Sequence, residues 1–169
     1  KYASEIRVTD YVNDVQYTHK QGYVYHDKVW LIYRDDFFDR FVKKLQLDVF
    51  TSFRDRQITN SKVSTHGKIW VLKSKNILDN GSIVHKTGYD RYVDSVEEFT
   101  VGQFLNTKSI IMPNFTYNTR ATILPDNTIP NGSIAILTPK VKNVKVDLAF
   151  YATDEFRRYY AIVKSLSRF

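Results

Sequence analysis

The stretch "KIWVLKSKNILDNGSIVH", from Lys68 to His85, decides the fold class of this chain. Its first part, "KIWVLK", places Ile69 and Val71 on one face of a strand and their neighbours on the other, a period of two that is typical of β-structure. The Asn80–Gly81 pair in "DNGS" readily takes positive φ and predicts a turn. The stretch therefore predicts a strand, a turn and a further strand.

The same pattern continues on both sides of this stretch. The runs "KSIIM", "FTYNTRATIL" and "GSIAILTP" lie between Lys108 and Pro139 and are rich in strand-forming residues. Between them "PNGS", from Pro130 to Ser133, predicts a second Asn–Gly turn with positive φ. Upstream, "GYVYHDKVWLIY", from Gly22 to Tyr33, indicates a strand pair or an irregular lead-in. Most of the chain is therefore expected to form short strands.

Two stretches predict helices. In "DDFFDRFVKKLQL" the phenylalanines recur at helical spacing, and Asp35 or Asp36 can cap the first turn. In "TDEFRRYYAIVKSLSRF" Thr153 is a good N-cap, and an apolar stripe runs from Phe156 to Leu166. The predicted class is α+β: a curved, mostly antiparallel β-sheet of short strands with a few flanking helices, including an amphipathic C-terminal helix.

Composition indicates a globular chain. It has 169 residues, of which 43% are hydrophobic and 15% aromatic, far more than a disordered chain carries. No apolar run approaches the ~20 residues needed to cross a bilayer, so we expect no membrane association. The absence of cysteine excludes disulfides and thiolate sites and fits a cytoplasmic location. The single methionine, Met112, leads us to expect a piece of a longer polypeptide.

The net charge of +7 is unevenly distributed along the chain. Residues 1–50 hold eight Lys and Arg against eight Asp and Glu, whereas residues 51–169 hold 17 against 10. The segment "RDRQITNSKVSTHGKIWVLKSKNI", from Arg54 to Ile77, contains a single acid, Asp55. Such an asymmetry favours a polyanion as partner, although a basic solvent-exposed face would have the same composition.

Searches for catalytic patterns are negative. The six glycines form neither a Walker A nor a G-x-G-x-x-G motif, and no G-x-S-x-G is present. The four histidines do not recur at metal-ligand spacing, and "DSVEEF", from Asp94 to Phe99, is typical of a solvated turn. "MPNFTY", from Met112 to Tyr117, has the residue types of the N-P-P-Y loop of amino-methyltransferases in the wrong order. Binding is therefore the favoured class of function.

The stretch "FTSFRDRQITNSKV", together with "LKSKNILDNGSI", "PNFTYNTRATILPDNTIPNGSIAILTPK" and the final "DEFRRYY", resembles the C-terminal target-recognition domain of adenine-specific DNA methyltransferases of type II restriction-modification systems. It is more distantly similar to type I specificity subunits. The resemblance covers residues 48–169, and residues 1–47 are expected to be a lead-in with one amphipathic helix. In such domains the late helix packs back on the sheet.

The resemblance implies a bacterial domain that binds double-stranded DNA in a groove and positions an adenine for a separate catalytic domain of the same parent chain. That domain would use S-adenosylmethionine, whereas this chain lacks the cofactor motif and N-P-P-Y and should be catalytically silent without any cofactor. The residues expected to contact DNA are Arg54, Arg56 and Gln57 at base edges or the groove, Lys62, Lys73 and Lys75 at phosphates, and Tyr117, Asn118 and Arg120 as a second contact loop.

Other readings of the same residues stay open. The domain could belong to a restriction endonuclease or to a fused restriction and methylation enzyme, or it could bind RNA or a protein. Ser74 and Asn76 are the types of residue that cap a turn and are interpreted as structural.

Overall fold

The computed structural model describes residues 5–11, 14–26, 29–114, 116–142 and 144–164. Contacts between residues divide the chain into two compact units. Unit 1 comprises Lys1–Leu45 and Asp154–Phe169, and unit 2 comprises Gln46–Thr153. The C-terminal helix is thus grouped with the beginning of the chain.

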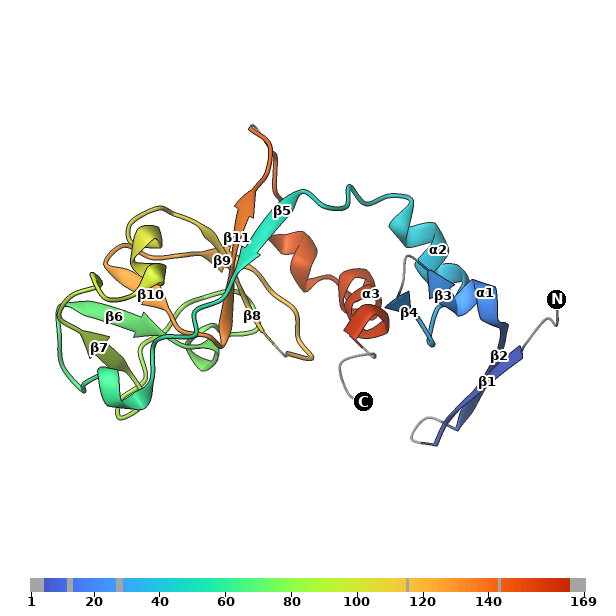
Figure 1. Cartoon of the computed structure of the whole chain (residues 1–169), viewed down its shortest axis with the longest axis horizontal. Coiled ribbons are helices and arrows are strands. Elements are labelled where there is room, and N and C mark those ends of the chain that lie inside the picture. Colours follow the sequence, from blue (N-terminus) through green and yellow to red (C-terminus); the bar gives the residue numbers. More distant parts are fainter. Residues whose placement is uncertain (1–4, 12–13, 27–28, 115, 143, 165–169) are drawn as a thin grey trace. The chain divides into compact units, whose positions relative to one another are not determined.

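Unit 2 contains two small sheets (Figure 1). The four-stranded sheet is antiparallel and has the order β5 (Phe50–Phe53), β11 (Ile134–Pro139), β8 (Ile110–Pro113) and β9 (Thr122–Ile123). In the three-stranded sheet, β6 (Ile69–Leu72) pairs in parallel with β10 (Thr128–Pro130) and antiparallel with β7 (Arg91–Val93). The 3-10 turns η1 (Asn60–Lys62), η2 (Ser74–Asn76), η3 (Thr100–Phe104) and η4 (Ala149–Ala152) lie between strands or follow them.

The core of unit 2 lies around β6. All four residues of this strand are buried. The alternation of Ile69 and Val71 with Trp70 and Leu72 therefore does not separate a solvent-exposed face from a buried one. Aliphatic residues from both sheets pack with it in one cluster that includes Leu72, Ile111, Leu124, Ile129 and Ile134. β6 is the central strand of its sheet, and apolar side chains of the cluster pack against both of its faces. The residues on both faces of β6 are therefore apolar.

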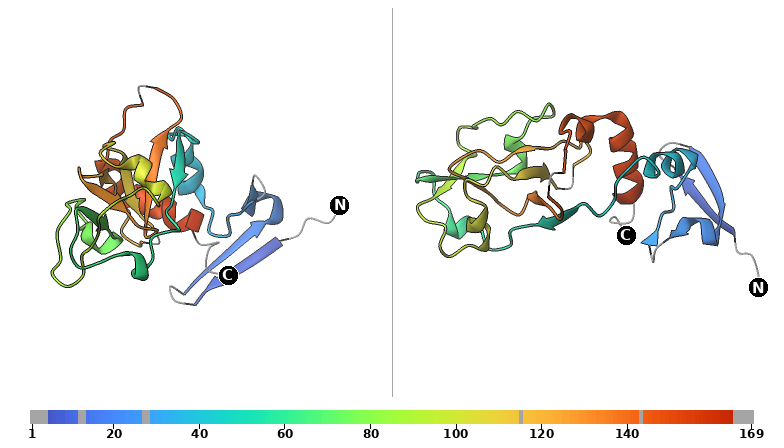
Figure 2. Two further views of the ribbon diagram at one scale, coloured as in Figure 1. Left: turned by 60° about the vertical axis from the view of Figure 1, so that its left-hand side comes forward. Right: turned by 90° about the horizontal axis from the view of Figure 1, so that it is seen from above.

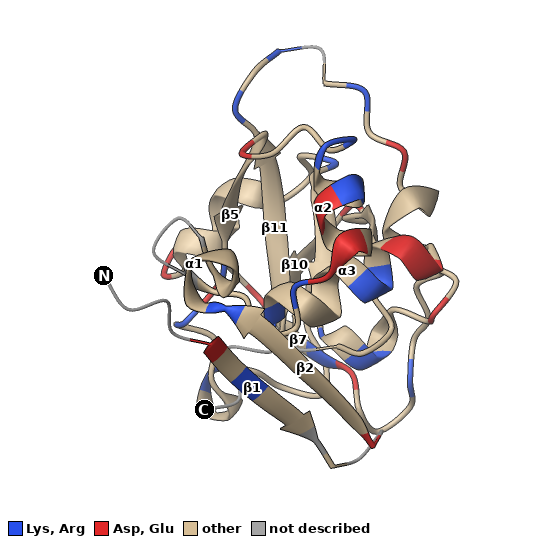
Figure 3. Ribbon diagram, turned by 90° about the vertical axis from the view of Figure 1, so that its right-hand side faces the viewer, with Lys and Arg blue, Asp and Glu red and all other residues tan. Residues whose placement is uncertain are grey.

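Unit 1 consists of two short hairpins and two longer helices (Figure 2). β1 (Glu5–Asp10) pairs antiparallel with β2 (Val15–Lys20), which leads into the single turn α1 (Gln21–Val24). β3 (Tyr25–His26) pairs with β4 (Val29–Trp30), where the sequence indicated a strand pair. The helices are α2 (Asp36–Val42) and α3 (Asp154–Lys164), each with acidic residues in its first turn (red in Figure 3).

The two helices of unit 1 pack against each other. Asp35 caps α2 by accepting a hydrogen bond from the Phe38 amide at 2.8 Å, as predicted. The rings of Phe38 and Tyr159 are stacked with centroids 5.6 Å apart, and Arg158 forms an ion pair with Asp35 at 2.6 Å. Within unit 1, α3 thus packs its apolar stripe against α2. Leu166, which the sequence placed on the same stripe, lies outside the described residues.

The predicted α+β class with short, mainly antiparallel strands and an amphipathic C-terminal helix is confirmed. The strands form several small open sheets, and the β6–β10 pair is parallel. No helix within the described ranges is long and apolar enough to cross a membrane.

Candidate nucleic-acid interface

The segment of residues 54–58, which follows β5, contains one acid, Asp55, and Asp55 stabilises its conformation. Asp55 is 4% exposed, and its Oδ2 accepts hydrogen bonds from the Gln57 and Ile58 amides at 3.1 and 2.8 Å. This Asx turn buries Asp55 and leaves its neighbours Arg54, Arg56 and Gln57 exposed. The acid inside the basic stretch therefore has a structural role.

Arg54 connects this segment to two other loops. Its Nε and Nη2 donate to the Gly132 carbonyl at 3.2 and 3.0 Å. With the Asn114 amide oriented by its hydrogen bonding, the Asn114 oxygen accepts from Nε, Nη1 and Nη2 of the same guanidinium at 2.5 to 3.2 Å. Arg54 thus joins the loop after β5 to the loop after β8 and to the β10–β11 turn.

Gly132 permits this close approach. A Cβ built at Gly132 would lie 2.6 Å from the carbonyl oxygen of Asp55, so no larger residue fits without a backbone shift. The sequence predicted positive φ at both Asn–Gly pairs. That prediction is confirmed at Gly81, with φ of 84°, and is wrong at Gly132, whose φ is not positive. Glycine is needed at Gly132 for its lack of a side chain and not for its torsion angles.

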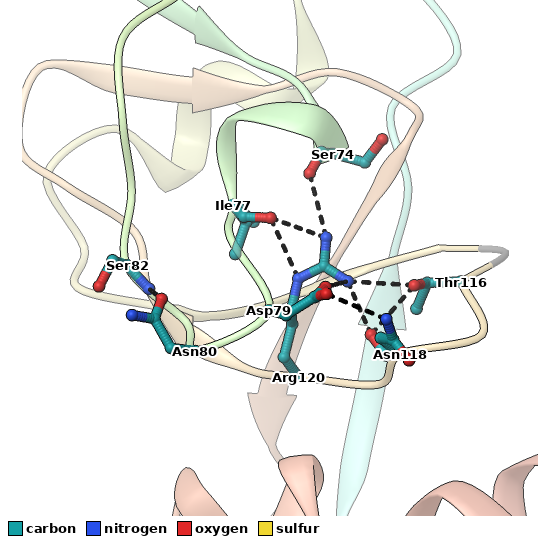
Figure 4. A network of polar contacts seen from close by, with 8 residues as sticks. All are labelled: Ser74, Ile77, Asp79, Asn80, Ser82, Thr116, Asn118 and Arg120. Atoms are coloured by element: carbon teal, nitrogen blue, oxygen red, sulfur yellow. Dashed lines mark hydrogen bonds and ion pairs between the residues drawn. The ribbon is translucent and has the colours of Figure 1, made fainter.

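Arg120, the last residue of the second predicted contact loop, is buried (Figure 4). Only 8% of the surface of Arg120 is exposed to solvent. Nε and Nη2 both donate to the Ile77 carbonyl, at 3.1 and 2.7 Å, and Nη2 also lies 3.5 Å from the Ser74 carbonyl. Nη1 donates to the Asn118 carbonyl at 2.7 Å and to Thr116 Oγ1 at 3.1 Å. The donors of Arg120 are thus directed at protein acceptors, whereas the sequence led us to expect Arg120 to contact DNA.

Asp79 joins the same network from the turn after η2. Its Oδ1 is 3.4 Å from Arg120 Nη1, and its Oδ2 accepts a hydrogen bond from Asn118 Nδ2 at 3.0 Å. Burial lowers the pKa of the Arg120 guanidinium from its ordinary value, and the charge of Asp79 opposes that shift. The guanidinium stays protonated. The loop after β8 is therefore fastened to the turn after β6 at several points.

One more hydrogen bond links the two networks. The Ser74 amide donates to Ser133 Oγ at 2.9 Å, so the turn after β6 also meets the β10–β11 turn. We name the meeting segments the loop cluster; it comprises residues 54–57, 74–80, 114, 116–120 and 131–133. The cluster links "RDRQ" with "YNTR", which lies about 60 positions further along the sequence. The links are the hydrogen bonds of Arg54 with Gly132, of Ser74 with Ser133 and of Arg120 with Ser74.

The loop cluster exposes a mixture of cationic, amide and aromatic side chains. The side chains of Arg56 and Lys75 are exposed and make no hydrogen bond or ion pair with any described residue. Tyr117 is 80% exposed, and Asn118 is exposed beside it. These are the groups through which such a surface can contact phosphates and base edges.

Two other predicted contacts are already engaged by protein groups. Lys62 forms an ion pair with Glu98 at 3.2 Å and lies 5.1 Å from the centre of the Phe99 ring. Gln57 accepts a hydrogen bond from the Thr100 amide through its Oε1 at 2.6 Å. Both side chains are exposed, but their partners lie in the segment around η3 and outside the loop cluster.

Lys73 does not point to a free phosphate-binding position. Its Nζ donates to the Tyr89 carbonyl and lies 3.7 Å from the centre of the Tyr89 ring. Burial lowers the pKa of Lys73, the charge of Arg91 lowers it further, and Asp90 opposes both. The half-buried Lys73 ammonium thus packs on an aromatic ring, whereas the sequence led us to expect Lys73 at phosphates.

Asn76 and Asp90 stabilise the turn after β6 through buried hydrogen bonds. Asn76 is fully buried; its Oδ1 accepts from the Lys73 amide at 3.1 Å, and its Nδ2 donates to the Val84 carbonyl and to Asp90 Oδ1 at 3.0 and 2.8 Å. Asp90 Oδ2 also forms a hydrogen bond with His85 Nδ1 at 2.8 Å. The interpretation of Asn76 as structural is confirmed, and Asn76 supports the backbone of the turn that carries Lys75.

The environment of Asp90 is expected to make the stability of the fold depend on pH. Burial alone would raise the pKa of Asp90, but hydrogen bonds from His85, Asn76 and the Lys86 amide outweigh it and hold the pKa below its ordinary value. A carboxyl with a lowered folded-state pKa stabilises the fold above its unfolded-state pKa, and this contribution is lost as the pH falls through the folded-state value.

We therefore expect the free energy of unfolding of the wild-type protein to fall more steeply below about pH 4 than that of Asp90→Asn. Asp90→Asn should be less stable at neutral pH, because an amide cannot accept all of these hydrogen bonds. Urea unfolding at a series of pH values measures both effects. Asp94→Asn, at an exposed carboxylate, is the control and should follow the wild type; parallel curves for wild type and Asp90→Asn would contradict the expectation.

Within the part of the chain that the structure describes, no group of three or more His, Asp or Glu residues could hold a metal ion. In comparisons with known proteins, no family model matches the chain and no curated protein shows significant similarity to it. The function is therefore inferred from the chain's own residues.

Proposed function

We propose that this chain is a sequence-specific recognition domain for double-stranded DNA. The observation that carries the proposal is the loop cluster. The two segments that the sequence led us to expect at DNA are linked in it by hydrogen bonds from Arg54 to Gly132, from Ser74 to Ser133 and from Arg120 to Ser74. A surface that reads a groove needs several loops side by side, since base edges and phosphates within one site are contacted together.

The charge of residues 51–169, which comprise most of unit 2 together with the C-terminal helix, supports a polyanionic partner. Residues 51–169 account for the whole net charge of +7, and Arg56 and Lys75 in the loop cluster have no carboxylate partner among the described residues. Arginine suits guanine edges because it donates two parallel hydrogen bonds, and lysine suits phosphate as a compact charge. Arg56 is therefore assigned to base readout and Lys75 to phosphate contact.

The parent polypeptide is proposed to be a bacterial adenine-specific DNA methyltransferase of a restriction-modification system, located in the cytoplasm. The catalytic domain of that parent would be the second partner and would bind S-adenosylmethionine. If the parent were instead a restriction endonuclease, it would use the same loop cluster. The sequence of the parent polypeptide would distinguish a methyltransferase from an endonuclease.

We expect Arg56→Ala and Lys75→Ala to impair DNA binding in different ways. Duplexes enriched from a randomised pool by the wild-type chain serve as probes, with scrambled duplexes and single-stranded RNA as competitors. Arg56→Ala should reduce discrimination between enriched and scrambled duplexes by ~1–3 kcal/mol, whereas Lys75→Ala should weaken all duplexes and reduce the salt slope by about 1. Fluorescence anisotropy over a range of salt concentrations measures both quantities.

Lys142→Ala is the matched control, because Lys142 is an exposed lysine beyond the far end of β11 from Gly132. If Lys142→Ala weakens binding as much as Lys75→Ala, net charge and not the loop cluster determines affinity. A wild-type chain that enriches no duplex, or that prefers single-stranded RNA, would exclude the proposed function.

A further inference from the structure

His85 is an exposed histidine whose ring is held by two other side chains. Its side chain is 66% exposed, and its Nδ1 lies 2.8 Å from Asp90 Oδ2. The ring stacks on that of Trp70, with the ring centroids 3.9 Å apart and 27° between the planes. Trp70 belongs to β6 and is buried, so the ring that supports the imidazole is part of the core of unit 2. The His85 ring is therefore restrained in position and orientation although most of it is open to solvent.

Asp90 determines which nitrogen of His85 carries the hydrogen. Asp90 Oδ1 accepts a hydrogen bond from Asn76 Nδ2 at 2.8 Å, and Oδ2 accepts one from the Lys86 amide at 3.0 Å. Burial alone would raise the pKa of Asp90, but these bonds and the one from His85 lower it, so the carboxyl is ionised at neutral pH. An ionised carboxylate only accepts hydrogen bonds, and His85 Nδ1 is therefore the donor. In the neutral ring, Nε2 is then an acceptor.

The segment that carries His85 is paired with the turn that carries Lys75. The Val84 amide donates to the Asn76 carbonyl at 2.9 Å, and Asn76 Nδ2 donates to the Val84 carbonyl at 3.0 Å. His85 directly follows Val84, and Lys75 directly precedes Asn76. His85 thus extends the loop cluster on the side of Lys75.

The acceptor of His85 is open for a ligand. Nε2 makes no hydrogen bond with any residue that the structure describes. Phosphate oxygens and the O6 and N7 atoms of guanine only accept hydrogen bonds, so they do not match an acceptor on a neutral ring. The donors that DNA presents in the major groove are the exocyclic amino groups of adenine and cytosine. His85 would therefore complement Arg56, whose guanidinium suits the acceptors of guanine.

We propose that His85 is a further contact residue of the DNA interface, in which its Nε2 accepts a hydrogen bond from an exocyclic amino group of adenine or cytosine. Asp90 is the positioning residue that keeps Nε2 free of hydrogen. This inference rests on the function proposed above, and it names one chemical group that the interface reads.

The first measurement is made without DNA. The chemical shifts of the imidazole nitrogens in the isotope-labelled wild-type chain, at about pH 8 where an unperturbed histidine is neutral, report which nitrogen carries hydrogen. His85 should carry hydrogen on Nδ1 and none on Nε2. His66 is the reference, because it is exposed and forms no ion pair with a described carboxylate, and it should show a mixture of both tautomers. Hydrogen on Nε2 of His85, in a neutral or a protonated ring, overturns the inference.

The second measurement uses the duplexes that the wild-type chain enriches, with His85→Phe, His85→Ala and the matched control His66→Phe. His85→Phe keeps a ring on Trp70 and removes both nitrogens, and both His85 variants should fold because the side chain is largely exposed. At one base pair of the enriched site, an analogue of adenine or cytosine that lacks the exocyclic amino group should weaken wild-type binding by about threefold to tenfold. The same analogue should change the affinity of either His85 variant by less than about twofold. His66→Phe should respond to it as the wild type does.

The inference is overturned, and the proposed function is left intact, if the wild type and both His85 variants respond equally to every analogue. Loss of the response in His66→Phe as well as in His85→Phe also overturns it, because the effect would then not be specific to His85. A wild-type chain that enriches no duplex overturns the proposed function, and the inference falls with it whichever tautomer His85 adopts.

Discussion

Asn76→Ala should destabilise the protein by about 2–4 kcal/mol, a large part of the total stability of a domain of this size. Asn76 is fully buried and its side chain serves three partners at once: the Lys73 amide, the Val84 carbonyl and Asp90 Oδ1. Alanine would leave these groups without a partner in a place that water does not reach, and each buried unsatisfied group costs about 1–3 kcal/mol. The carboxylate of Asp90 would lose one of the bonds that hold it ionised.

Urea unfolding followed by circular dichroism measures this loss through the midpoint and the m-value. Asn80→Ala is the matched control, since Asn80 lies in the same region and accepts a single exposed hydrogen bond, from the Ser82 amide at 3.0 Å. Its replacement should cost less than about 1 kcal/mol. Comparable losses for the two variants would mean that the Asn76 network contributes no more than an ordinary surface turn.

Gly132→Ala should destabilise the protein by about 1–3 kcal/mol and also weaken DNA selectivity. The new Cβ would lie 2.6 Å from the Asp55 carbonyl oxygen, a backbone atom that cannot rotate away. Relief of this contact requires the segment after β5 to move, and that segment carries Arg54 and Arg56. The variant therefore tests the scaffold of the loop cluster without removing any side chain that is proposed to contact DNA.

Gly22→Ala is the control for the general effect of replacing glycine. Nothing lies within 4 Å of a Cβ at Gly22, which is in the short helix α1, and alanine there should be neutral or stabilising by up to about 1 kcal/mol. Thermal unfolding of both variants and the affinity ratio for enriched over scrambled duplex provide the readouts. An unchanged melting temperature in Gly132→Ala would show that the segment after β5 moves freely.

Local patterns in the sequence were enough to predict local structure. The cap at Asp35, the turn at Asn80–Gly81 and the strand Ile69–Leu72 each depend on residues within a few positions of one another. The same holds for the structural role of Asn76, whose bond to the Lys73 amide spans three residues. Propensity and periodicity carry this kind of information, and the α+β class followed from it.

The roles of Arg120, Lys73 and Gly132 could not be predicted because they depend on partners distant in the sequence. Arg120 bonds to Ile77 over 43 positions, and Gly132 approaches Asp55, which lies 77 positions earlier in the sequence. A basic residue in a polar loop looks the same in the sequence whether its donors face water or carbonyls. One signal was present in retrospect: Asp55, the only acid in a long basic stretch, marked the turn around which the loop cluster forms.

The division of the chain has a consequence for the order of events during synthesis. Unit 2 is continuous, from Gln46 to Thr153, whereas unit 1 needs α3, which is translated after all of unit 2. On the ribosome, unit 2 can complete its core while α2 still exposes Phe38, the residue that stacks on Tyr159 of α3. The loop cluster can therefore form before the N-terminal part of the chain acquires its final partner, and the nascent chain must tolerate an uncovered aromatic stripe in the interval.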